Sequence, residues 1–184
     1  MDRYFHQYQQ AYGAPSWTNA GGDVSESWHF SGPRWFSEGT AEWVALVYPG
    51  LSGLKGDAED TAGVRSRIDE RGEQYRQKRA ASLQDHGEHV TIAQTLSPNL
   101  RDNPTWRYVD SHDLYHSHVY AGGLCAVDFL LGHALDRPAF DRLMSLFPEI
   151  EAKDDWEAAF LDWSGYGSMG AFYAAFDEYV VASG

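Results

Sequence analysis

The fold is decided by residues 35–43, which read WFSEGTAEW. Large apolar side chains stand at both ends of this stretch, and Val47 continues the same face at helical spacing. Pro33 suits the first position of a helix, and the Pro-Gly pair at 49–50 predicts its end. We therefore expect an amphipathic helix that begins at Pro33 and packs its aromatic face against a core.

Two carboxylates, Glu38 and Glu42, lie one turn apart on this helix, among the large apolar residues. A carboxylate in such surroundings is costly unless it meets a cation, a metal ion or good hydrogen-bond donors. The alternative is a pair of glutamates on the exposed rim of the helix, which is where glutamate is usually found. The pair is therefore a candidate site.

Outward from this stretch, the chain reads as mainly α-helical. A helical stripe ends at Gly13, and the next segment, up to Gly32, is rich in Ser, Gly and Asn and is expected to be a loop. Residues 86–106 look irregular and contain the one weak strand candidate, at 89–95. Further helices are expected over residues 57–84, 113–135, 138–146, 154–163 and 168–181.

Two of these helices have distinctive patterns. The segment 57–84 is highly charged, with only a thin apolar stripe at Val64, Ile68 and Tyr75, which is typical of a surface helix. The segment 113–135 is apolar and long enough to be a buried helix. Ser168 is the predicted N-cap of the last helix.

Charge and composition exclude several classes of protein. The 184-residue chain has 14 basic and 27 acidic side chains, and its formal charge of −13 argues against nucleic acid or an anionic membrane surface as the partner. It has no run of 18 apolar residues, so no transmembrane helix is expected. The single cysteine, Cys125, excludes an internal disulfide framework and a zinc site with several cysteines.

Two further segments have the spacing of metal ligands. Asp2 and His6 are four residues apart in the first helix, and one helical turn matches the span between two ligands of one metal ion. His112 and His116 have the same spacing, with Asp113 between them. In each segment the alternative is an ordinary helix end with polar residues, because short patterns of this kind often occur by chance.

The order of these segments resembles the gluzincin zinc metallopeptidases, the thermolysin-like superfamily often called peptidase MA. The first helix ends in x-x-x-H, the stretch 35–43 follows, and a string Y-x-x-G-x-x-x-x-x-F-L starts at Tyr120. In that family an H-E-x-x-H helix gives two zinc ligands and the general base. A downstream glutamate in an E-G-x-A-E-like string is the third ligand. A tyrosine stabilises the oxyanion. The resemblance implies the helical lobe of such a catalytic domain, with little or no β-sheet.

The resemblance assigns a role to each matching residue. The string DRYFHQYQ, which starts at Asp2, resembles H-E-Y-F-H-x-Y-Q, so His6 takes the position of the second histidine ligand and Asp2 that of the first. Glu38 matches the third zinc ligand, and Glu42 matches the supporting glutamate one turn later. Tyr120 matches the catalytic tyrosine. The resemblance therefore implies a Zn²⁺ site and a peptide or protein as substrate or ligand.

The sequence departs from the family pattern at two catalytic positions. Asp2 replaces the first histidine, and Arg3 replaces the general-base glutamate. A guanidinium group cannot accept a proton at neutral pH, and its charge disfavours a nearby divalent cation. The ligand set would then be Asp2, His6 and Glu38. Its two carboxylates favour hard cations, so it would hold zinc less tightly than a set with two histidines does.

Three interpretations remain open. The one we favour is a gluzincin domain that keeps the fold and a cleft but has a degenerate zinc site. In the second, the protein is an active metal-dependent hydrolase, and His112, His116 or His118 supplies the missing ligand, with Asp113 or Glu42 as the base. The third is a non-catalytic helical module that binds a peptide or a carbohydrate with aromatic loop residues, namely Trp17, Trp28, Trp35 and Trp106.

Residues 1–184 are expected to form a single domain that begins inside its first helix. We therefore expect the chain to be the helical part of a longer protein, in which a β-rich lobe normally precedes this helix. Nothing in the sequence identifies the substrate, the compartment or the oligomeric state.

Overall fold

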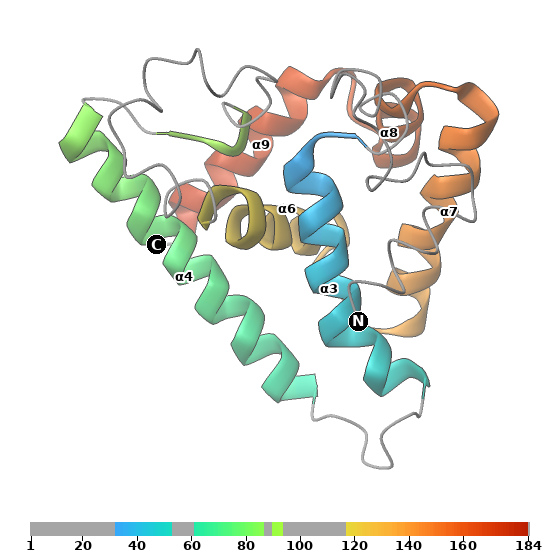
Figure 1. Ribbon diagram of the computed structural model, residues 1–184, viewed down its shortest axis with the longest axis horizontal. Helices are drawn as coiled ribbons and strands as arrows, with labels where there is room; N and C mark the ends of the chain where they lie inside the picture. Colours follow the sequence, from blue (N-terminus) through green and yellow to red (C-terminus); the bar gives the residue numbers. More distant parts are fainter. Residues whose placement is uncertain (1–31, 53–60, 87–89, 94–116, 184) are drawn as a thin grey trace, which may run out of the picture.

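The computed structural model describes residues 32–52, 61–86, 90–93 and 117–183 (Figure 1). These ranges contain no β-strand, so the prediction of a mainly α fold is confirmed for them. Val90–Ala93, within the weak strand candidate, contains a short 3₁₀ turn instead. The elements are α3 (Arg34–Ser52), α4 (Thr61–His86), the π-helical turn η3 (Ser117–Gly122), α6 (Gly123–Leu130), α7 (Arg137–Lys153), α8 (Trp156–Ser164) and α9 (Met169–Ala182).

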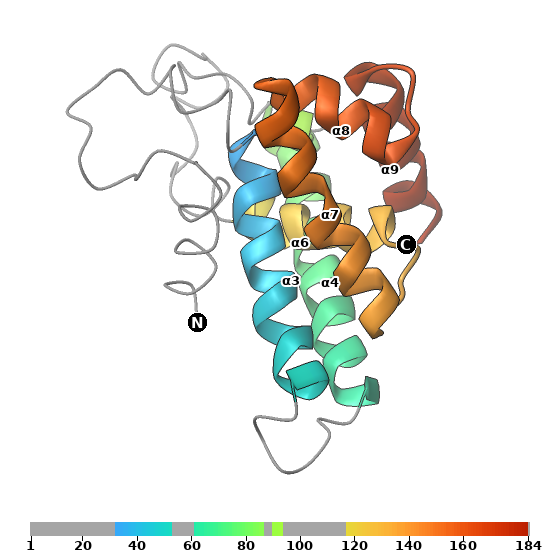
Figure 2. The same cartoon turned by 90° about the vertical axis from the view of Figure 1, so that its right-hand side faces the viewer.

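Helix α6 lies at the centre, with α3, α4 and α9 around it (Figures 1 and 2). Its sequence, GLCAVDFL, is apolar on every side except at Asp128, and all of its residues are buried apart from the partly buried Phe129. The Phe129 ring packs on α9 against Phe176 and Tyr179, with ring centroids 5.8 and 5.0 Å apart. A helix that is apolar all round must be covered on all sides, and this explains why the other helices surround it.

Helix α3 approaches α6 so closely that their backbones touch. A Cβ atom added at Gly39 would lie 2.2 Å from the carbonyl carbon of Gly123. One added at Gly123 would lie 2.1 Å from the carbonyl oxygen of Trp35. Because main-chain atoms cannot move aside as a flexible side chain can, both positions require glycine for this packing.

The first turn of α3 is fixed to α8 and α9 by aromatic side chains. The Trp35 ring is stacked on Phe172 at 5.4 Å, and its indole N–H donates a hydrogen bond to the Tyr173 hydroxyl at 3.1 Å. Phe36 packs against Trp156 with centroids 5.3 Å apart. Trp35 is fully buried, so the prediction that it lies in a ligand-gripping loop is wrong.

Helix α4 follows the predicted pattern of a surface helix. Its apolar stripe of Val64, Ile68 and Tyr75 is buried, and most of its other residues are exposed or half-buried. Two arginines tie it to the rest of the fold: Arg65 pairs with Asp128 of α6, and Arg79 Nη2 lies 3.0 Å from Asp177 Oδ2 of α9. None of the helices in the described ranges has both the length and the apolar character needed to cross a membrane.

Several helix ends differ from the sequence prediction. Helix α3 continues past Pro49 to Ser52, and α7 continues past Pro148 to Lys153. Each proline removes one backbone N–H, and in α7 the buried Phe147 and Ile150 on either side of Pro148 favour continuation. The buried helix predicted to reach residue 135 ends at Leu130, because Gly132 and His133 adopt left-handed conformations.

The starts of the last three helices were predicted more accurately than the helix ends named above. The Ser168 hydroxyl accepts a hydrogen bond from the Ala171 N–H at 3.1 Å, which confirms it as the N-cap of α9. Asp155 caps α8 in the same way through the Ala158 N–H. Asp136 caps α7 through the Ala139 N–H.

The close approach of α3 and α6 predicts that alanine substitution changes the free energy of unfolding in opposite directions at two glycines. Gly123→Ala should lower the free energy of unfolding by about 1–3 kcal/mol, because the added methyl group collides with the α3 backbone. Gly63→Ala, on the exposed face of α4 with no atom within 4 Å, should raise it by about 0.5–1 kcal/mol. Urea denaturation of both variants measures the difference. Equal changes in the free energy of unfolding of the two variants would contradict the close contact between α3 and α6.

Candidate functional site

The two motifs that carry the resemblance meet at the contact between Gly39 and Gly123. Gly39 follows Glu38 in α3, and Gly123 is the third residue after Tyr120, at the junction of η3 and α6. The π-helical turn also packs against α3 directly. Segments that are about 80 residues apart in the sequence therefore lie against each other.

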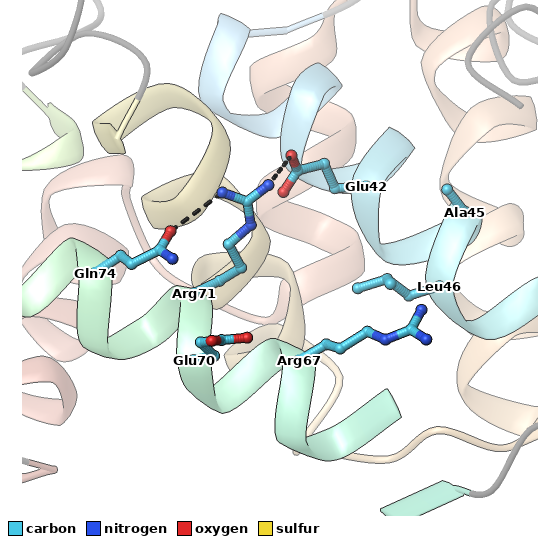
Figure 3. Close-up of a pocket in the computed structure, with 7 residues that line it drawn as sticks. All are labelled: Glu42, Ala45, Leu46, Arg67, Glu70, Arg71 and Gln74. Atoms are coloured by element: carbon cyan, nitrogen blue, oxygen red, sulfur yellow. Dashed lines mark hydrogen bonds and ion pairs between the residues drawn. The ribbon is translucent and has the colours of Figure 1, made fainter. Parts of the chain in front are cut away.

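Glu38 and Glu42 both lie on α3 and are half-buried. The Glu42 carboxylate points across to α4, where its Oε1 lies 3.6 Å from Arg71 Nη2 (Figure 3). The side chains of this pair are 25% and 47% exposed, so water screens the interaction. The sequence indicated a cation for this glutamate but gave no sign that it would be Arg71.

Tyr120 lies in the π-helical turn and is half-buried. A π-helical turn holds one residue more per hydrogen-bonded ring than an α-helix, and such turns are frequent at functional sites. The two glycines that follow Tyr120 face opposite sides: Gly122 contacts Tyr75 and Ile92, whereas Gly123 contacts α3. The turn that carries Tyr120 is therefore packed against side chains of Tyr75 and Ile92 on one side and against the α3 backbone on the other.

His118, an alternative metal ligand in the sequence analysis, lies in the core. It is fully buried, and its Nε2 lies 2.9 Å from the carbonyl oxygen of Val90. Its ring packs edge-on against Tyr75 with centroids 5.1 Å apart. A metal ion at Nε2 would have to displace the contact with Val90, so the geometry favours a structural role for this histidine.

The other expected ligands lie outside the described residues. These are Asp2, His6, His112, Asp113 and His116. Among the residues that the structure does describe, no three His, Cys, Asp or Glu side chains come together as a metal site. Of the ligand set implied by the resemblance, Glu38 alone is therefore placed.

A groove of about 410 Å³ separates α3 from α4 beside the Glu42–Arg71 pair (Figure 3). It exists because these two helices hardly touch each other, and both pack on η3 and α6 instead. Its lining is mixed in charge and polarity: Glu42, Ala45, Leu46, Arg67, Glu70, Arg71 and Gln74.

A second polar cluster lies at the C-terminal end of α6. Arg65 donates two hydrogen bonds to the Asp128 carboxylate, at 2.7 and 3.1 Å, and a third to the backbone carbonyl of His133 at 2.6 Å. The His133 Nδ1 lies 2.6 Å from Asp128 Oδ2. Burial works against the charge on Arg65, but the hydrogen bonds and charge of Asp128 outweigh it and raise the pKa of Arg65.

The sequence contained one signal for this cluster, which the sequence analysis did not use. Asp128 is the single charged residue in the apolar run of α6, and a buried carboxylate needs a cation or several donors. The partners, Arg65 and His133, are 63 and 5 residues away and have no local signature.

Comparison of the chain with protein-family models, with curated proteins and with solved structures found no significant match.

Cys125 gives a test of the packing between α4 and α6. Its thiol lines a cavity of about 230 Å³ and is 8% exposed. Burial raises the pKa of this thiol to about 12. Because the thiolate is the reactive form, alkylation at pH 8 should be slower in the folded protein than in the urea-unfolded protein, by roughly a thousandfold. Iodoacetamide labelling followed by mass spectrometry measures both rates. Similar rates would mean that α4 does not cover Cys125.

Proposed function

We propose that this chain is a gluzincin-like metallopeptidase domain with a degenerate zinc site. The observation that carries the proposal is the backbone contact between Gly39 and Gly123. It joins the helix of Glu38 and Glu42 to the turn of Tyr120. This adjacency supports the proposal because the family's third metal ligand and its tyrosine must act on one substrate carbonyl.

The donor set is suited to a divalent cation but not to fast hydrolysis. Glu38 with Asp2 and His6 would offer two carboxylates and one imidazole, which are ligands that zinc accepts. When bound, zinc polarises a carbonyl group and lowers the pKa of its water. Arg3 cannot accept the proton of that water, because guanidinium stays protonated. Loss of a general base alone costs a factor of about 10²–10⁴ in rate.

The remaining catalytic group is Tyr120. Its phenol can donate a hydrogen bond to an oxyanion, and the π-helical turn holds it half-buried, where such a bond is stronger than in water. A domain of this kind would bind a peptide carbonyl through the Tyr120 hydroxyl and a metal ion held by Glu38, and would turn it over slowly. The proposal is therefore of a peptide-binding relative of the hydrolytic enzymes.

Metal content tests the ligand assignment. Purified protein loaded with equimolar zinc and then dialysed should retain the metal, and Glu38→Ala and His6→Ala should each lose it. Glu151→Ala, an exposed residue of α7 with the same charge change, is the matched control and should retain zinc. Circular dichroism confirms that each variant is folded. Wild-type protein without retained zinc would rule out the metal site, and retention by Glu38→Ala would rule out the role of Glu38.

Restoring the family pattern tests the degenerate site. The double variant Asp2→His, Arg3→Glu should hold zinc more tightly and hydrolyse a fluorogenic peptide library at least about a hundredfold faster than the wild type, because it regains a ligand and a base. Tyr120→Phe in the same background should then lower kcat, with little change in KM. If the wild type already hydrolyses peptides as fast as the double variant does, the proposed loss of hydrolysis is wrong.

A further inference from the structure

We propose that the groove between α3 and α4 binds the free C-terminal carboxylate of a peptide, with Arg71 as the main binding group. The proposed binding at Arg71 uses no metal ion, although Glu42 in the groove is one turn from Glu38 on α3. The groove volume of about 410 Å³ is within the range of small-ligand sites, of roughly 300–1,000 Å³. It is large enough for one or two residues at the end of a peptide.

The contacts of Arg71 leave it suited to an additional carboxylate. Its Nη1 donates a hydrogen bond to Gln74 Oε1 at 3.1 Å, so the guanidinium group lies between Gln74 and Glu42 (Figure 3). Its Nη2 lies 3.6 Å from Glu42 Oε1, longer than the 2.7–2.9 Å typical of a charge-assisted hydrogen bond. Glu42 therefore neutralises part of the charge of Arg71 without making the close, two-bond contact that an arginine can form.

The rest of the lining matches a terminal residue better than an acidic side chain. Ala45 and Leu46 give the groove an apolar part on the α3 side, and Arg67 adds a second cation one turn before Arg71 (Figure 3). A C-terminal residue presents a carboxylate and an apolar side chain on the same Cα atom, so it can use both surfaces. Glu70 also lines the groove and disfavours a second negative charge on the ligand.

In this arrangement Glu42 competes with the ligand. Both carboxylates need the same guanidinium group, and the Glu42–Arg71 pair is partly exposed, so water weakens it. A ligand that forms two parallel hydrogen bonds to Arg71 replaces this pair at little cost. Removal of the Glu42 charge should therefore strengthen binding, an effect opposite to that of removing Arg71.

The experiment is a titration with N-acetyl-Ala-Leu that has a free carboxylate, followed by ¹H–¹⁵N NMR of the whole chain in EDTA. We expect saturable shifts at α3 and α4 residues of the groove. Arg71→Gln should weaken binding at least about tenfold, from the loss of a charge-assisted hydrogen bond. Glu42→Gln should tighten it about two- to fivefold. Arg137→Gln, which removes an exposed arginine of α7 that pairs with Asp141, should leave it unchanged.

Two further peptides identify the group that is recognised. N-acetyl-Ala-Leu-amide should not bind, and N-acetyl-Ala-Glu-amide should bind at least about tenfold more weakly than the free acid, because its carboxylate is on a side chain. Equal binding of the amide, equal binding of the glutamate peptide, or an unchanged affinity of Arg71→Gln would each overturn the proposal. Because EDTA removes zinc, failure of the metal site leaves this result unaffected.

Discussion

The described part of the fold depends on the approach of two backbones at Gly39 and Gly123. No side chain separates α3 from the start of α6, and this sets the depth at which both helices enter the core. The aromatic residues Trp35 and Phe36 reach α8 and α9 from that depth. The same contact fixes the π-helical turn against α3. One steric constraint therefore determines the packing of the core and the arrangement of the candidate site.

Ion pairs between side chains add to the stability of the apolar core mainly along α4. This helix has a narrow buried stripe, so few apolar contacts hold it in place. Arg65, Arg71 and Arg79 reach from it to Asp128, Glu42 and Asp177 on three different helices. The Asp128 pair is nearly buried, and breaking such a pair costs more than breaking an exposed one. Hence Arg65 is expected to hold α4 in place more strongly than Arg71 does.

Periodicity predicted most of the helices, because an amphipathic stripe of the kind formed by Val64, Ile68 and Tyr75 is a local property. Capping residues such as Ser168 were predicted for the same reason. The predicted helix ends at Pro49 and at residue 146 were wrong, and in α7 the buried Phe147 and Ile150 outweigh the hydrogen bond lost at Pro148. The predicted boundary at residue 135 was wrong because Gly132 and His133 both adopt left-handed conformations, which are uncommon for a residue other than glycine.

The candidate site was predictable only in part. Glu38, Glu42 and Tyr120 were identified from motif order, but Arg71 has no motif and depends on how α4 lies beside α3. The burial of His118 against Val90 and Tyr75 is likewise a property of tertiary packing. Partners that are distant in the sequence are fixed by the fold, and a single sequence without aligned relatives carries no signal for such pairs.

The imidazole of His133 links the solvent to the interior. Its side chain is 42% exposed, yet its Nδ1 is bonded to a carboxylate that is only 4% exposed. Since a carboxylate accepts, Nδ1 is the ring nitrogen that carries the proton in this contact. The ¹⁵N signals of this one ring therefore form a natural spectroscopic reporter. Loss of the Nδ1–H tautomer would signal that the His133 ring has separated from Asp128 at the end of α6.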